Sequence, residues 1–320
     1  MPEKLPVKSL VEGSFLAAIT ALLFIFSIYI PLLGTLISFL CPLPIIFLYL
    51  RHHLKFTLLS LLVAGFLVSM IAGPLQGIFV LLGFGVIGLT LGYTIKRGYT
   101  FNEIIIFGSI SSLLSKILIL WLGFWLMDLN PLMFDMQQLD TIIDQSLNFY
   151  QGLGLSPEQL TILKDNLTQT LNIFRLAFPA MLILASIFDV FLNYLVSRIV
   201  LKRFGYKLPE FFSFSYWRAS PSCVLSYLVG WILIFLGVRY NLPLLHKIGI
   251  NVQIFFTILF FIIGLSLINF FLQKYKIGSI FKWMIYFLIF FLPFLSQFIT
   301  WVGIFDVWID FRRLGEVGAK

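Results

Sequence analysis

The chain has 320 residues, of which 60% are hydrophobic and 11% are charged. Soluble domains average about 25% charged residues, so this composition excludes an ordinary water-exposed surface. The formal net charge of +8 does not indicate nucleic-acid binding, because basic residues in membrane proteins mostly set their orientation. Cys41 and Cys223 form no CxxC spacing, so the sequence predicts neither a disulfide framework nor a zinc site.

Long apolar stretches follow one another along the whole chain. A helix needs about 20 apolar residues to cross a hydrocarbon core of about 30 Å. The predicted membrane helices cover residues 10–30, 32–50, 56–72, 75–95, 102–127, 171–201, 221–238 and 248–272. A last apolar run, 280–304, contains Pro293 about midway, and it either crosses the membrane or folds back as a re-entrant segment. The predicted fold class is therefore all-α, a polytopic transmembrane helical bundle of eight or nine helices.

Charge placement predicts the orientation of these helices. The Lys/Arg clusters fall on the side of the N-terminus, at 51–55, 96–97, 198–207 and 274–282. Segment 128–170 lies on the other side and carries six acidic residues against one lysine. The positive-inside rule then places the N-terminus in the cytoplasm and segment 128–170 on the outer side of the membrane. A ninth crossing would put Arg312 and Arg313 outside, so the side of the C-terminus stays open.

The external segment has helical signals of its own. Residues 136–151 show apolar positions at helical spacing, and Gly152 and Gly154 break the pattern. Ser156, Pro157 and Gln159 then have the spacing of a helix start, with Ser as N-cap, Pro at the first position and Gln at the third. The sequence predicts an external helical hairpin, which either covers an outward-facing pocket or is a solvated loop with no role.

An aromatic linker, residues 204–220, separates two groups of membrane helices. Its Phe, Tyr and Trp side chains favour the membrane interface, so we expect it at the cytoplasmic surface, in the headgroups or bound to a partner. The predicted domains are a six-helix membrane domain at 1–203, this linker, and C-terminal membrane helices at 221–320.

Few ionisable residues lie deep in the predicted helices, and each is a functional candidate because a charge in lipid is costly. Lys116 is about 20 Å from the cytoplasmic start of its helix, and Asp189 is about 18 Å from the cytoplasmic end of the next one. Three interpretations stay open: a buried ion pair that fixes helix register, a ligand or ion site, and no contact. The neighbouring polar residues in this cluster are Ser112, Ser115 and Asn193.

Smaller features complete the list of candidates. Gln76, near the outer end of the fourth helix, is a candidate for lining an external pocket. That helix also carries GxxxG spacings, which favour close helix packing. Gly13, Ala17 and Ala21 form a flat stripe on the first helix, suited to docking another helix of this chain or of a partner.

The ends of the predicted helices carry further charged residues. Glu12 and Glu103 lie near helix starts, where a carboxylate complements the helix dipole. His52 and His53 have no acidic neighbour in sequence and are interpreted as interface residues. A C-terminal charge knot is predicted from Asp306, Asp310, Arg312 and Arg313. No zinc, nucleophile-elbow or nucleotide-loop motif occurs, so we expect no enzyme, no metal and no cofactor.

Several segments resemble one family when they are taken in order: LVEGSFLAAITALL, PLPIIFLYLRH, GFGVIGLTLGY, SLLSKILIL, NYLVSR and FDVWIDFRR. Together they resemble the YybS-like bacterial membrane proteins (domain of unknown function 2232), a family whose resemblance implies no particular activity.

The first six helices also resemble, more distantly, the substrate-binding (S) components of energy-coupling-factor vitamin transporters. That resemblance implies an outward-facing pocket for a small molecule, and a docking role onto a coupling subunit for the stripe at Ala17 and Ala21. The alternative is a non-catalytic membrane scaffold or partner-binding protein of the cell envelope, which needs no ligand. In both cases we expect contact with the lipid bilayer, and another membrane protein would bind through helix one or the cytoplasmic linker.

Overall fold

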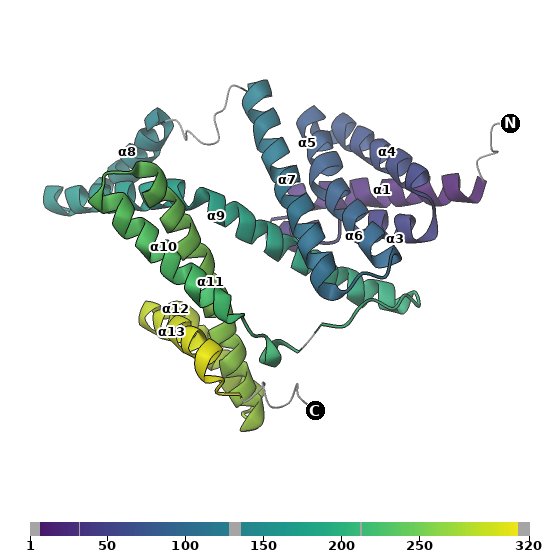
Figure 1. The fold of residues 1–320 in the computed structure, drawn as a ribbon. Coiled ribbons are helices and arrows are strands. Elements are labelled where there is room, and N and C mark those ends of the chain that lie inside the picture. Colours follow the sequence, from purple (N-terminus) through teal and green to yellow (C-terminus); the bar gives the residue numbers. More distant parts are fainter. Residues whose placement is uncertain (1–6, 32, 128–135, 212, 313–320) are drawn as a thin grey trace. The chain divides into compact units, whose positions relative to one another are not determined.

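The computed structural model describes residues 7–31, 33–127, 136–211 and 213–312, and the secondary structure of this part of the chain is helical (Figure 1). Two compact units make up the chain. Unit 1 comprises Met1–Phe149 and Leu182–Glu210, and unit 2 comprises Tyr150–Met181 and Phe211–Lys320. The all-α fold class is confirmed.

Unit 1 contains the first helices of the chain. These are α1 (Val7–Tyr29), α2 (Gly34–Ser38), α3 (Leu43–Arg51), α4 (Leu54–Ala72), α5 (Pro74–Phe79), a π-helical segment η1 (Val80–Gly85), α6 (Val86–Lys96) and α7 (Phe101–Met127). Most of α8 (Met136–Gly152) and the second part of α9 (Pro157–Arg203) also belong to it. Predicted helix two is thus α2 and α3 joined by turns, and predicted helix four is interrupted by η1.

Unit 2 contains the first part of α9 and the C-terminal helices. These are a 3-10 turn η2 (Phe214–Tyr216), α10 (Pro221–Arg239), α11 (Pro243–Lys274), α12 (Ser279–Phe291) and α13 (Pro293–Ile309). Over the described residues, eight helices or helix groups are long and apolar enough to cross a membrane, and α12 with α13 would make a ninth.

The start of α9 has the capping geometry that the sequence predicts. Gly154 ends the turn after α8 with φ of +89°, a value that side chains disfavour. Ser156 N donates to Gln159 Oε1 at 2.9 Å, and Gln159 N donates to Ser156 Oγ at 3.3 Å. This reciprocal pair is a capping box. From Pro157, α9 continues for 47 residues, about 70 Å at 1.5 Å per residue and more than twice a hydrocarbon core.

The last apolar run is bent rather than straight. The axes of α12 and α13 differ by 102°, and the break falls at Pro293, which cannot donate a backbone hydrogen bond. The pair begins four residues after α11 ends. Just beyond α13, Arg312 donates to Ser266 Oγ in the last turns of α11, at 2.8 Å. Both ends of the pair therefore lie toward the same end of α11, and a pair bent in this way is a broken span or a re-entrant segment.

Small residues bring the helices of unit 1 into close contact. The stripe Gly13, Ala17 and Ala21 is buried, and Ser60 Oγ of α4 donates to Gly13 O at 2.6 Å. A Cβ at Gly88 would lie 2.9 Å from Ile45, so α6 and α3 touch there. Helix α4 of the same chain therefore packs against the stripe on helix one. Of the two alternatives that the sequence leaves open, a helix of the same chain is the one that contacts the stripe, and docking to a partner stays a prediction.

Glycines also bring the helices of unit 2 into close contact. A Cβ on Gly303 of α13 would overlap Phe260 O of α11, and one on Gly237 of α10 would lie 2.5 Å from His246 N of α11. In lipid, where apolar surface gains little from burial, such close backbone contacts contribute much of helix association. Buried aromatic and branched side chains surround them, among them Tyr227, Phe260 and Val307.

The two halves of the aromatic linker pack on different units. In unit 1, Tyr194 Oη donates to Pro209 O at 2.5 Å, and the rings of Phe47 and Phe204 lie 5.1 Å apart. In unit 2, Ser215 Oγ donates to Gln273 Oε1 at 2.9 Å. The linker is thus anchored to its own chain at both ends, while side chains such as Phe204 stay exposed.

Candidate functional site

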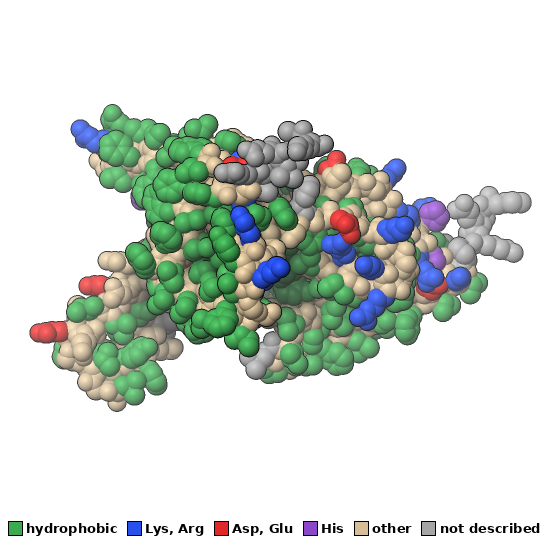
Figure 2. Space-filling model, turned by 90° about the horizontal axis from the view of Figure 1, so that it is seen from below, with side chains coloured by type: hydrophobic (Ala, Val, Ile, Leu, Met, Phe, Trp, Pro, Cys, Tyr) green, Lys and Arg blue, Asp and Glu red, His purple; other side chains and the backbone are tan. Residues whose placement is uncertain are grey.

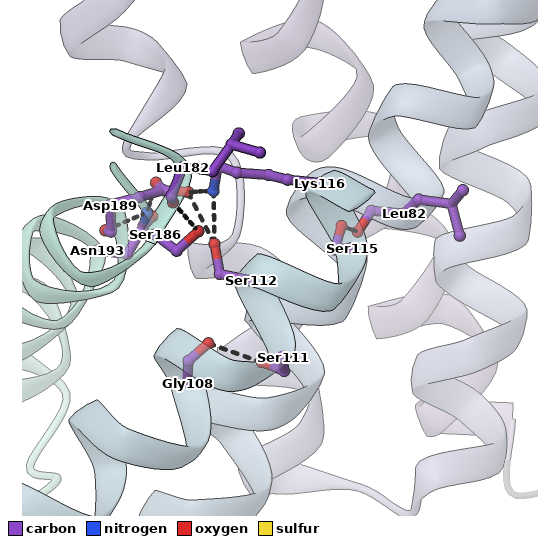
Figure 3. Close-up of polar contacts among 10 residues, drawn as sticks. All are labelled: Leu82, Gly108, Ser111, Ser112, Ser115, Lys116, Leu182, Ser186, Asp189 and Asn193. Atoms are coloured by element: carbon purple, nitrogen blue, oxygen red, sulfur yellow. Dashed lines mark hydrogen bonds and ion pairs between the residues drawn. The ribbon is translucent and has the colours of Figure 1, made fainter. Parts of the chain in front are cut away.

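Lys116 of α7 and Asp189 of α9 form the ion pair that their predicted depths suggest. Lys116 Nζ lies 2.9 Å from Asp189 Oδ2 and donates a second hydrogen bond to Ser112 Oγ at 2.6 Å (Figure 3). Ser112 Oγ in turn donates to Asp189 Oδ2 at 3.4 Å. The Ser112 hydroxyl lies one turn before Lys116 on the same face of α7, so it can hydrogen-bond to both charged groups.

The second oxygen of Asp189 is held from its own helix. Asn193, one turn further along α9, donates from Nδ2 to Asp189 Oδ1 at 2.8 Å. Its own Oδ1 has no hydrogen-bond partner among the described residues, although the residue is only 1% exposed. Ser109 Oγ of α7 is also buried without such a partner. Unpaired buried polar atoms cost free energy, so both are positions where a water or ligand donor would be stabilised.

The π-helical segment η1 brings predicted helix four into the same cluster. Ser115, next to Lys116 in α7, donates from Oγ to the carbonyl of Leu82 in η1. A π-turn disrupts the regular backbone ladder, and such turns are frequent at functional sites. Ser115 is therefore the polar contact between α7 and η1. The sequence identified Ser115 but not its partner; the nearby Gly83 and Gly85 are the signal that the helix is irregular here.

The charged pair is deep in its helices but not fully enclosed. Lys116 is about 22 Å from Phe101 along α7, and Asp189 is about 21 Å from Arg203 along α9. Their side chains are 27% and 24% exposed. Charged groups at such depth normally face protein or a water-filled cavity rather than lipid. The exposed edge of this pair therefore needs a polar partner or a protein cover.

Gln76, the candidate for an external pocket, lies at the turn between α4 and α5. With its amide nitrogen facing the turn, the side chain donates to Ala72 O at 2.9 Å and to Gly73 O at 3.3 Å. Gly73 has φ of +105° and separates α4 from α5. Gln76 thus caps a turn that leaves carbonyls of α4 without helical partners. These contacts give Gln76 a local structural role, and its place in an external pocket stays a prediction.

The C-terminal charge knot is buried and extends further than predicted. Arg312 Nη2 lies 2.6 Å from Asp306 Oδ2, and the two side chains are 0% and 1% exposed. Arg312 also donates to Ser215 O at 2.6 Å and to Trp217 O at 2.8 Å, which ties the linker to α13. Asp310 belongs to a separate pair, 3.2 Å from Arg218. Arg313 lies outside the described residues.

Sequence reasoning missed a second polar cluster, at the start of α1. Glu12 Oε2 lies 2.7 Å from His52 Nε2 and 3.2 Å from Arg51 Nη1, and Ser9 Oγ lies 3.0 Å from His52 Nδ1. Glu12 therefore pairs with α3 and its following turn, beyond any dipole effect. His52 does have an acidic partner, contrary to our interpretation from neighbouring residues. Among the described residues, no group of three or more His, Cys, Asp or Glu could hold a metal ion.

Comparison with known proteins identifies the family. A family model described as "Predicted membrane protein (DUF2232)" matches residues 18–307. The chain belongs to this family. It is also 27% identical, over 274 residues, to "Uncharacterized protein YybS" of Bacillus subtilis (strain 168), covering 83% of this chain and 85% of that protein.

These findings and the apolar helices make the chain a multi-pass membrane protein. No solved structure matches it, so the resemblance to S components gains no support from known structures.

Proposed function

We propose that this protein binds a small molecule and takes part in its transport across the bacterial cytoplasmic membrane, with an S-component-like arrangement of its first six helices and a cytoplasmic N-terminus. The proposal places the ligand against the cluster of Lys116, Asp189, Asn193, Ser112 and Ser115. It assigns no catalytic activity, metal or cofactor to the chain.

The observation that carries the proposal is the convergence of polar groups from three predicted helices at mid-depth. Ser115 contacts η1, Lys116 contacts α9, and Asn193 orients Asp189. A purely structural ion pair in lipid would gain from complete enclosure, yet about a quarter of each charged side chain is exposed. Asn193 Oδ1, which is buried without a hydrogen-bond partner among the described residues, is a further acceptor in this cluster. Docking through helix one is not part of the proposal, since α4 covers Ala17 and Ala21.

Native mass spectrometry of protein extracted gently from its own membrane tests the proposal. We expect a retained small molecule on the wild type and its loss from Lys116→Met/Asp189→Asn. Arg198→Gln/Glu210→Gln is the matched control, because it removes an ion pair of 3.1 Å in which Glu210 is exposed. The control should keep the molecule. A wild type that is empty under these conditions, or a site variant that still binds, would contradict the proposal.

A second candidate function is a non-catalytic scaffold that binds envelope proteins, through the aromatic linker. One observation favours it: Lys116 and Asp189 satisfy each other without any ligand. The same preparation separates the two functions. A scaffold would be recovered empty and bound to envelope proteins, and the double site variant would keep those partners.

A further inference from the structure

One end of unit 1 carries a concentration of basic side chains. The exposed lysines and arginines here, which we name the basic surface, are Lys8, Arg51, Lys55, Lys96, Arg97, Lys202, Arg203 and Lys207. Figure 2 shows Lys and Arg side chains, with histidines beside them, gathered at the right of the view. They follow the ends of several helices, so the fold rather than one charged run assembles them.

Direct contacts bring these helix ends together. Lys96 at the end of α6 donates to Tyr49 O at 2.9 Å and to His52 O at 2.8 Å, which caps the end of α3. The ring of Phe47 in α3 lies 5.1 Å from Phe204, just after α9. Through α3, the charges that follow α6 and α9 therefore belong to one surface.

The carboxylates at this end are already bound by other groups. Glu12 pairs with Arg51 and His52, and Glu210 pairs with Arg198. Glu103 accepts hydrogen bonds from the backbone and hydroxyl of Thr100, each at 2.8 Å. No ion pair joins a described carboxylate to the remaining members of the surface, Lys8, Lys55, Arg97, Lys202, Arg203 and Lys207. These like charges repel one another unless an external anion neutralises them.

Aromatic rings place the basic surface at the level of the headgroups. The guanidinium of Arg97 lies 5.6 Å from the ring centre of Tyr93. That ring is 6.2 Å from Tyr99, which is 5.6 Å from Phe107. Tyrosines concentrate where hydrocarbon meets water, and the predicted membrane spans Pro74–Lys96 and Phe101–Leu126 end and begin here. The charges therefore lie where lipid phosphates lie.

We infer that the basic surface binds the headgroups of anionic phospholipids. Clusters of four to eight Lys or Arg next to membrane helices attract anionic lipids, and the attraction falls off within a Debye length. The anion layer supplies the counter-charge that the described residues lack at this end of unit 1. This inference is independent of the Lys116–Asp189 site and of the proposed function.

The test is a titration of phosphatidylglycerol into the purified protein in neutral detergent, followed by thermal unfolding. Lys55→Gln/Arg97→Gln removes two members of the surface that have no carboxylate partner. Arg239→Gln/Lys247→Gln is the matched control, since both are exposed basic residues at the junction of α10 and α11 in unit 2. We expect the first double variant to need about tenfold more phosphatidylglycerol for half-maximal stabilisation, and the control to behave as wild type.

Phosphatidylcholine with the same acyl chains should stabilise the wild type less, and salt should reduce the difference between the two lipids. Equal effects of the two lipids on the wild type would overturn the inference. So would equal losses in the two double variants. An acidic protein as the true partner would give either of these results. Unfolding without lipid, measured for each variant, confirms that all of them are folded at the start.

Discussion

The side-chain amide of Asn251 in α11 bridges the backbone of α9 beside Pro179. Asn251 Oδ1 accepts a hydrogen bond from Ala180 N at 2.8 Å, and its Nδ2 donates to Leu176 O at 2.7 Å. Proline has no N–H, and its ring crowds the carbonyl four residues earlier, so the helical ladder opens at this point. One amide replaces a donor and an acceptor at once, which matters because unpaired backbone groups in lipid cost several kcal/mol.

Replacing this amide tests the bridge. Asn251→Ala leaves Ala180 N and Leu176 O without their partner, so we expect a loss of about 1–3 kcal/mol in the free energy of unfolding. Gln253→Ala is the control, because Gln253 hydrogen-bonds to Thr257 within α11. Denaturant unfolding in detergent measures both variants. If Gln253→Ala lowers the free energy of unfolding as much as Asn251→Ala does, the bridge to α9 does not account for the loss.

A double-mutant cycle tests the coupling of Lys116 and Asp189. Each single change, Lys116→Met or Asp189→Asn, leaves one largely enclosed charge without its partner. We expect each to lower stability by about 1–3 kcal/mol, less than for a fully buried pair because both side chains are partly exposed. The double variant should recover part of the loss. Unfolding and the yield of monodisperse protein are the measurements, and purely additive losses would show that the two residues are not coupled.

Two glycine-to-alanine substitutions distinguish a close packing contact from an open position. In Gly303→Ala the new methyl group overlaps Phe260 O, so α13 must move away from α11. Overpacking of this kind costs about 1–3 kcal/mol. In Gly123→Ala nothing lies within 4 Å of the new Cβ, and the change should be neutral or stabilising by up to about 1 kcal/mol. Thermal unfolding compares them, and similar melting temperatures would contradict the close contact of α11 with α13.

Arg312→Met tests the buried charge knot. The change leaves Asp306 as an unpaired carboxylate and frees Ser215 O and Trp217 O, so we expect a loss of about 3–5 kcal/mol. The linker should also become easier to cleave by trypsin at Arg218. Asp310→Asn, which removes the partly exposed pair with Arg218, should cost at most about 1 kcal/mol. Equal cleavage of the wild type and Arg312→Met would show that the knot does not hold the linker.

Local chemistry is what the sequence predicts well in this chain. The membrane helices follow from apolar length, and the capping box at Ser156 and Gln159 follows from residue types three positions apart. The contact of Lys116 with Asp189 is one of the interpretations that their equal depths on consecutive antiparallel helices leave open, and the structure shows it. Each of these rests on distances along the chain that 1.5 Å per residue converts directly into space.

Contacts between segments that are distant in sequence cannot be predicted in this way. Nothing near Asn251 in sequence indicates that its amide completes α9, 71 residues away. Arg312 was assigned to a local knot, yet its partner Ser215 is 97 residues away. From sequence alone, the stripe on helix one suits a helix of this chain or of a partner, and only the fold shows that α4 contacts it. Gly83 and Gly85 indicate an irregular helix, but they do not reveal that Ser115 of α7 donates to Leu82 O there.

The bend at Pro293 bears on how many times the described chain crosses the membrane. A re-entrant α12 and α13 would add no crossing to the eight helices or helix groups that are long and apolar enough to cross, whereas a broken span would add a ninth. An even count would put the two ends of the described chain in the same compartment. Reporters fused to either end would then share one pH, one redox state and one set of proteases, and they would do so whichever way round the protein is inserted.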